Sequence, residues 1–157
     1  MKKIQVFCHF IMLAGSLSAL WSCSKACQAG YANPNCSIEI RAPYENLYYT
    51  VTESEDQDSA YTYSATIISS PAGPFALQLT NVANGVFFVN NVNGLVSITG
   101  DSLTIARQNP DTNANYIQGL GTLYNNVLTL NFTISHPDSL PFIHTQTDTF
   151  QSIWIHP

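Results

Sequence analysis

The sequence predicts an all-β protein: an antiparallel meander of eight or nine short strands, folded as a small barrel or a sandwich after an N-terminal helix. Three observations lead to this prediction. Apolar and polar residues alternate with a period of two in several segments. Pairs such as Asn-Gly, which favour tight turns, separate these segments. Charged residues make up only 10% of the chain, and Thr, Tyr, Asn and Ser, which suit strands and turns, are abundant.

The first 22 residues have the order of a secretory signal. Lys2 and Lys3 form a positive start, an apolar run extends from Ile4 to Leu20, and the small residue Ser22 ends it. We therefore expect a signal helix over residues 1–22. Two alternatives stay open: an uncleaved transmembrane helix, because about 18 to 20 apolar residues span a bilayer, and an ordinary signal peptide that is cut elsewhere.

The segment Leu20-Trp21-Ser22-Cys23 resembles the lipobox that precedes the acylated cysteine of bacterial lipoproteins. The resemblance implies cleavage before Cys23, a diacylglycerol thioether on that cysteine, and an acyl chain such as palmitate on the new N-terminus. Two or three buried chains anchor a protein stably, whereas one holds it only marginally. Ser24 stands where an aspartate would signal inner-membrane retention. The resemblance therefore implies a cell-envelope protein anchored in the outer membrane.

Four cysteines occur, at positions 8, 23, 27 and 36. Cys8 belongs to the signal and Cys23 to the lipobox, which leaves Cys27 and Cys36 to pair as a disulfide in an oxidising compartment. The ten residues from Cys27 to Cys36 also resemble the last loop of an EGF-like module, with Gly30 and an aromatic residue after it. A whole module needs six cysteines, so we expect only a stapled stub or linker over residues 23–42.

Residues 43–157 are expected to form the all-β domain. The clearest alternation covers 127–135, where Leu128, Leu130, Phe132 and Ile134 share one face. The same pattern predicts strands at 47–52, 61–67, 75–80, 95–99, 103–106 and 150–155. Gly119 and Gly121 lie on one face of a further strand and indicate close backbone packing.

Turns are expected where these runs are interrupted, at Asn84-Gly85, Asn93-Gly94, Gly100-Asp101 and Asn125-Asn126. Longer breaks are expected at 70–74 and 109–113. The acidic run 53–58 could be a cation site, but it lacks the spacing of an EF-hand loop. We therefore interpret it as a solvated loop.

The chain resembles a group of small Bacteroidetes-type lipoproteins, in which an EGF-like stub leads into an uncharacterised β-domain. The matching segments are the 27–36 loop, the strand at 44–51 and the sequence Gly119-Leu120-Gly121-Thr122. Such domains are often similar to lipocalins, and the resemblance implies a small barrel of the lipocalin or calycin type. The Gly-x-Trp signature of true lipocalins is absent here.

Composition argues against a nucleic-acid partner, because only three basic residues face ten acidic ones once Lys2 and Lys3 are removed. We expect a membrane-anchored envelope protein that acts as a binding or structural module, without catalysis or cofactor, and with a protein or glycan partner. The alternative is a lipocalin-like carrier of a small apolar ligand. Its cavity would be lined by Phe75, Phe87, Phe88, Phe132 and Trp154.

Three weaker motifs also occur in the sequence. Gly100-Asp101-Ser102-Leu103 matches the motif of the GDSL hydrolases, but the Asp-x-x-His that would supply the base is absent, so an esterase is the least favoured hypothesis. The spacings of His136, His144 and His156 fit no short metal motif, and we interpret them as surface or packing residues. An Asp-Ser-apolar pattern typical of Bacteroidetes-type O-glycosylation occurs three times, which makes candidate sites of Ser59, Ser102 and Ser139.

Overall fold

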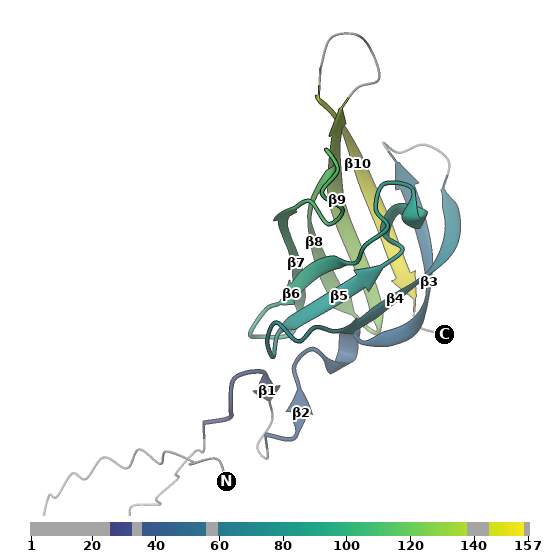
Figure 1. Ribbon diagram of the computed structural model, residues 1–157. Helices are drawn as coiled ribbons and strands as arrows, with labels where there is room; N and C mark the ends of the chain where they lie inside the picture. Colours follow the sequence, from purple (N-terminus) through teal and green to yellow (C-terminus); the bar gives the residue numbers. More distant parts are fainter. Residues whose placement is uncertain (1–25, 33–35, 56–59, 138–144, 156–157) are drawn as a thin grey trace, which may run out of the picture.

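Eight strands form a closed antiparallel barrel in the computed structural model, which describes residues 26–32, 36–55, 60–137 and 145–155 (Figure 1). The strands follow one another around the barrel in chain order, and the last closes on the first. The predicted meander is confirmed, and of the two architectures the barrel is the correct one. The barrel strands are β3 (Asn46–Glu55), β4 (Tyr61–Ser69), β5 (Ala76–Thr80), β6 (Val92–Val96), β7 (Ser102–Gln108), β8 (Tyr116–Tyr124), β9 (Val127–Pro137) and β10 (Thr145–Ile155).

The inward faces of the strands make a single hydrophobic core. On β9 the predicted face is buried, with Leu128, Leu130 and Ile134 fully covered and Phe132 2% exposed. On β10 the buried residues alternate with exposed ones, as the sequence predicted. Because every second side chain of a strand points to the same face, the apolar alternation is enough to place these side chains inside.

Two of the four predicted tight turns are confirmed. Asn125 and Asn126 join β8 to β9 with φ angles of 49° and 62°, the left-handed conformation that such a two-residue turn needs. Gly100-Asp101 lies in the turn between β6 and β7, which begins at Ser97 rather than after Thr99, because the Ser97 N–H donates to the Ser102 carbonyl. The expected strand at 95–99 therefore ends at Val96.

Of the other two turn predictions, one is wrong and one is confirmed in part. Asn93-Gly94 lies inside β6, where Gly94 is buried and a Cβ would come within 2.8 Å of the Leu103 side chain. This glycine makes room in the core and does not form a turn. Asn84-Gly85 does separate two strands and has the expected positive φ angles, but it lies with the 3-10 helix η2 (Val82–Gly85) in the long connection between β5 and β6 and not in a two-residue hairpin turn.

The glycines of β8 bring two strands close together. A Cβ on Gly119 would lie 2.6 Å from Phe132 Cβ and 2.8 Å from the Asn131 carbonyl oxygen, a distance that real side chains do not reach. Gly119 pairs with Ile105 on one side and with Phe132 on the other. The sequence prediction of close backbone packing here is confirmed, and the missing side chain leaves room for Phe132.

A small stub precedes the barrel. Strands β1 (Tyr31–Ala32) and β2 (Ile38–Glu39) pair with each other, and the predicted disulfide between Cys27 and Cys36 is present, with an S–S distance of 2.14 Å. The 3-10 helix η1 (Ala42–Tyr44) then places Tyr44, which is fully buried, at the end of the barrel nearest the stub. We call this end the base and the opposite end the mouth (Figure 1). The predicted signal helix and Cys23 lie outside the described residues.

Candidate binding site

Arg41 fixes the stub to the base of the barrel. Its Nη1 donates to the carbonyl oxygens of Ser70, Gly73 and Ala76, at 2.9–3.2 Å, around the turn between β4 and β5. Its Nε lies 3.3 Å from a carboxylate oxygen of Glu39 and 3.0 Å from one of Glu45. A guanidinium can satisfy several acceptors at once in fixed directions, so this single side chain sets the angle between stub and barrel.

Gly30 allows the stub to approach the base closely. Its φ of +90° is a conformation that residues with a Cβ rarely adopt, and a Cβ there would lie 2.4 Å from Pro74 Cβ. Its carbonyl accepts the N–H of Ile40, whose side chain lies against Gly100 on the base. The stub is therefore a docked part of the barrel and not a loose linker.

The first polar cluster near the mouth centres on Glu53, which points inward from β3 and is fully buried. Tyr61 and Tyr63 on β4 donate hydrogen bonds of 2.6 and 2.7 Å to its two carboxylate oxygens. Burial raises the pKa of the Glu53 carboxyl above its ordinary 4.5, while the two tyrosine hydrogen bonds oppose that rise. Burial also raises the pKa of both tyrosines, and the adjacent carboxylate raises it further, so their hydroxyls stay protonated donors.

The interpretation of residues 53–58 as a solvated loop is wrong for the residues that the structure describes. Glu53 and Glu55 belong to β3, and only 56–58 lie outside the described part of the chain. Glu53 continues the inward alternation of Tyr49 and Val51, so the strand pattern places it in the core despite its charge. Two tyrosine hydroxyls then compensate for the lost contact with water.

The second polar cluster joins β9 and β10 at the mouth. The Nε2 of His136 lies 2.7 Å from a carboxylate oxygen of Asp148, and the Gln146 amide donates to the other oxygen at 2.9 Å. Asp148 is only 3% exposed. His136 is partly buried and packs against Phe87, in agreement with its interpretation as a surface or packing residue, but the sequence does not predict its contact with Asp148. The other two histidines of the domain, His144 and His156, lie outside the described residues.

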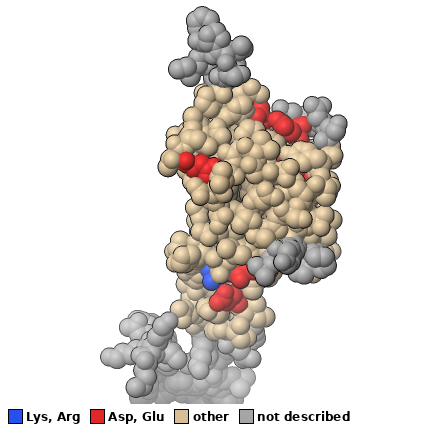
Figure 2. Space-filling view, turned by 45° about the vertical axis from the view of Figure 1, so that its right-hand side comes forward, with Lys and Arg blue, Asp and Glu red and all other residues tan. Residues whose placement is uncertain are grey.

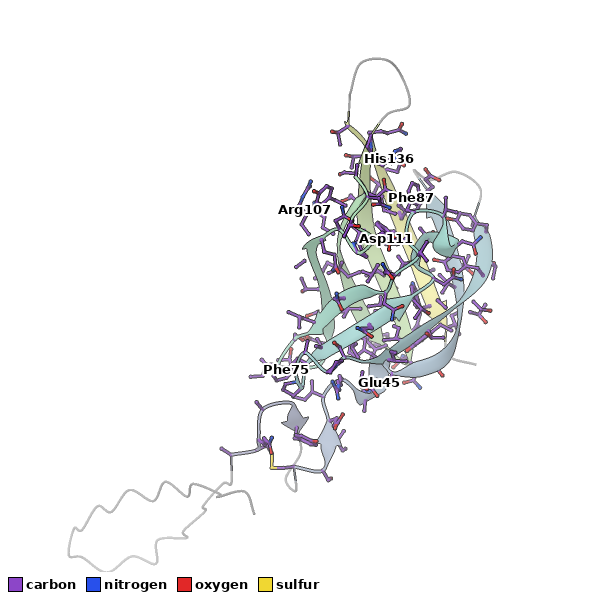
Figure 3. All side chains as sticks on the ribbon, viewed as in Figure 1. Glu45, Phe75, Phe87, Arg107, Asp111 and His136 are labelled. Carbon is purple, nitrogen blue, oxygen red and sulfur yellow. A yellow bond between two sulfur atoms is a disulfide. The ribbon has the colours of Figure 1, made fainter. Side chains whose placement is uncertain are left out.

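An aromatic strap, residues 86–91, crosses the mouth between η2 and β6 (Figure 3). The ring of Phe87 packs 5.4 Å from His136 and 5.9 Å from Phe150, centroid to centroid. Asp111, in the connection between β7 and β8, accepts the backbone N–H groups of Val89 and Asn90 at 2.6 and 2.7 Å. The strap is thus held both by the side chains beneath it and by a neighbouring loop.

An outer groove of about 510 Å³ lies on the side of the barrel, over β7, β8 and β9. The outward side chains of the groove form two rows, because paired residues on neighbouring strands lie side by side. Gln118, Thr133 and Thr149 are paired in one row, and Leu120 and Asn131 in the next. Gly119 lies between the rows, and the buried side chains of Ile105 and Phe132 lie beside it. The volume is within the range of small-ligand sites, although the groove is open to solvent.

A β-bulge shapes one wall of this groove. From the Ile105–Gly119 pair to the Gln108–Ile117 pair, β7 advances by one residue more than β8. The extra residue interrupts the alternation, so Ala106 and Arg107 are both exposed. The Arg107 guanidinium stacks 4.6 Å above the Tyr116 ring, which leaves its N–H edge directed away from the ring. Figure 3 shows Arg107 projecting outward from the side of the barrel.

The described surface is predominantly uncharged. Figure 2 shows one face on which the carboxylates lie toward the two ends and almost only uncharged side chains lie between them. Arg41 and Arg107 are the basic residues in the described part of the chain. Arg41 is engaged with carboxylates at the base. Among the described residues, the guanidinium of Arg107 in the outer groove is therefore the only one available to a ligand.

Several predicted site residues are spread over the molecule. Of the five aromatic residues proposed to line a cavity, Phe88, Phe132 and Trp154 are buried in the core and Phe87 packs against it, whereas Phe75 lies at the base (Figure 3). Ser102 begins β7, directly after the Gly100-Asp101 turn. Of the other candidate glycosylation sites, Ser59 and Ser139 lie outside the described residues.

The described residues do not assemble a hydrolase site around Ser102. Ser102 pairs with Thr122, and Thr122 pairs with Thr129 on β9. The only described histidine, His136, is seven residues further along that strand, roughly 23 Å at the usual rise per residue. The neighbouring Asp101 carboxylate instead accepts hydrogen bonds from the Ser97 and Thr99 hydroxyls within its own turn.

The outer groove and the two mouth clusters were not found by sequence reasoning. Outward Gln, Asn and Thr residues look like ordinary surface positions in the sequence, and only the strand register places them side by side. The inward position of Glu53 could be predicted from the sequence, since this residue continues the apolar alternation of its strand. No such signal pairs His136 with Asp148, because they lie on different strands.

No known protein family, curated protein or solved structure matches this chain. In the described part of the chain, no three His, Cys, Asp or Glu side chains converge as metal ligands would. No helix among the same residues has the length and hydrophobicity to span a membrane.

Proposed function

We propose that this protein is a lipid-anchored protein of the cell envelope whose barrel is a rigid, non-catalytic binding module. The anchor is Cys23 in the lipobox-like segment, and the proposed location is the outer membrane. The observation that carries the proposal is the docking of the stub on the base through Arg41 and Gly30. A binding module benefits from such a fixed base, because the binding surface is then presented in one orientation.

The length of chain between anchor and stub supports this arrangement. Cys27, the first cysteine of the disulfide, is four positions after Cys23, so the two cysteines lie at most about 14 Å apart when the chain between them is extended. The stub in turn lies at the base. A lipid on Cys23 would therefore keep the base near the membrane and leave the sides and the mouth of the barrel accessible.

Packing favours a ligand on the outer surface over a carried apolar ligand. The inward side chains of the eight strands form one cluster, which includes Trp154, Phe132 and Phe150. Phe132 and Phe150 stack inside the barrel with their centroids 4.9 Å apart. A carrier would have to displace such contacts to admit a ligand, at the cost of well-packed core area. The closed barrel is compatible with the lipocalin-like alternative without favouring it.

Acyl labelling tests the anchor. When cells that express the protein are grown with a radiolabelled fatty acid, we expect label on the wild type and none on Cys23→Ala, because only the thiol can carry the thioether-linked lipid. When the same cells are fractionated, the wild type should be found in the membrane fraction and the variant in the soluble fraction. Label on both proteins, or on neither, would contradict a lipid at Cys23.

Substitution of Arg41 tests the fixed base. We expect Arg41→Ala to lower the free energy of unfolding by about 1–2 kcal/mol, since a partly exposed cation loses several charge-assisted hydrogen bonds. Hydrogen exchange of the Ile40 amide should become faster as its bond to Gly30 loosens. Arg107→Ala is the matched control, because Arg107 is exposed and contacts none of the stub. Equal effects of the two substitutions on that amide would rule out the proposed role of Arg41.

A further inference from the structure

We propose that the outer groove binds a neutral oligosaccharide. This inference deepens the proposed function, since it names the ligand class of the binding module and rests on the barrel being one. The chemistry of the side chains that line the groove selects the ligand.

The groove offers hydrogen-bonding side chains of the kind that pair with hydroxyl groups. Gln118 and Asn131 each carry an amide with two donors and an acceptor, and Thr133 carries a hydroxyl. The Asn131 side-chain oxygen accepts a hydrogen bond from Gln151, which orients that amide, and its NH₂ group has no hydrogen-bond partner among the described residues. Within the described residues, neither the Gln118 amide nor the Thr133 hydroxyl contacts a protein hydrogen-bond partner. Both groups are therefore available to a ligand.

Between the polar groups the floor of the groove is apolar. Leu120 is 54% exposed, and Gly119 beside it adds no side chain. Sugar rings present C–H faces between their hydroxyls, so a saccharide needs both kinds of surface at short spacing. The outward side chains of paired residues lie about 5 Å apart across strands, close to the size of one sugar ring.

Charge argues against ionic ligands. No carboxylate lines the groove, and Arg107 would repel a cation. An anion would find a single guanidinium in a chain whose net charge is −5. An uncharged ligand meets neither obstacle and can still accept hydrogen bonds from the edge of Arg107.

Topology argues against an extended peptide. A peptide is usually bound by adding a strand to the free edge of a sheet. The barrel is closed, so its eight strands leave no such edge, and the groove lies on the face of the sheet. A purely apolar ligand is also disfavoured, since it would cover the amides of Gln118 and Asn131 without replacing their hydrogen bonds to water.

The test uses the full lipidated chain in detergent micelles whose head groups contain no sugar. Maltohexaose, cellohexaose, chitohexaose and mannohexaose are titrated by calorimetry, and backbone amide shifts are followed by NMR. We expect at least one of them to bind, with shift changes in β8 and β9 near Gln118 and Asn131. The double substitution Gln118→Ala/Asn131→Ala should weaken binding about tenfold or more, as expected for the loss of two hydrogen-bonding side chains.

Thr122→Ala is the matched control, because Thr122 points outward from the same strand beyond the groove. It should leave the affinity unchanged, and thermal unfolding should show that all variants are folded. The inference is overturned if none of the four sugars binds, if the double variant binds as tightly as the wild type, or if the shifts cluster at the mouth. Acyl labelling of the same protein separates the two proposals: label without sugar binding removes only the groove, and sugar binding without label removes only the anchor.

Discussion

Trp154→Ala is expected to lower the free energy of unfolding by about 3–5 kcal/mol, the range for removal of a large aromatic side chain from a core. Trp154 is fully buried on β10, and its ring meets that of Tyr49 edge-on at a centroid distance of 5.7 Å. Its Nε1 donates to the Ser152 hydroxyl at 2.8 Å. The substitution therefore removes packing and leaves a buried hydroxyl with one partner fewer. Since domains of this size have about 5–15 kcal/mol of stability, the variant should be close to unfolding at 37 °C.

Urea unfolding followed by far-UV circular dichroism measures this effect without relying on tryptophan fluorescence. Ile153→Ala is the control, because Ile153 is the next residue on β10 but points outward and is 39% exposed. Its loss should cost less than about 1 kcal/mol, as for most surface positions. If both substitutions cost the same, Trp154 does not face the core while Ile153 faces outward, and the register of β10 is wrong.

Glu53→Gln is expected to remove the contribution of this buried carboxyl to the pH dependence of stability. Burial raises the folded-state pKa of Glu53 above the value of 4.5 that the unfolded chain would show. Between these two values the folded protein holds a proton that the unfolded chain releases, so rising pH favours unfolding. The stabilising contribution is fully present below pH 4.5 and is lost as the pH rises through the folded-state pKa. Each unit of the upward shift corresponds to about 1.4 kcal/mol.

The amide of glutamine stays neutral at every pH, so the variant should be increasingly more stable than the wild type as the pH rises from about 4.5 to neutrality. Chemical unfolding of both proteins over this range measures the difference and cancels the titration of other groups. Glu39→Gln is the control, and its difference in stability from the wild type should change with pH in the opposite direction. The reason is that hydrogen bonds from Tyr31 and Arg41 lower the pKa of the exposed Glu39. A constant difference between wild type and Glu53→Gln across the range would show that Glu53 is ionised in the folded protein.

The polar clusters near the mouth illustrate what strand alternation predicts and what it does not. Alternation places Glu53 on the same face as Tyr49 and Val51, but the acidic neighbours in the sequence suggest a loop. The tyrosines that make burial possible lie on the next strand, with Tyr61 directly paired to Glu53. A sequence pattern reports the face of one strand, whereas the cost of burying a charge depends on groups from another.

The glycines also show which features the sequence predicts and which it does not. Gly119 was recognised as a point of close packing because two glycines share one face of a strand, and the Phe132 contact confirms it. At Gly94 the sequence predicts a turn, because Asn-Gly is a strong turn signal. The sequence cannot distinguish a glycine that allows a turn from one that makes room for Leu103 on a neighbouring strand, since both need only the absence of a Cβ.

By itself the sequence determined the all-β class, the meander, the inward residues of the long strands, the Asn125-Asn126 turn and the pairing of Cys27 with Cys36. These features depend on neighbours in the chain, on the period of two, or on the number of cysteines. The tertiary structure alone decided that the meander closes into a barrel, that Arg41 holds the stub to its base and that Gln118 and Asn131 face one groove. Each of these depends on which strands lie side by side and in what register, and register is set by the packing of the whole core and not by any single segment.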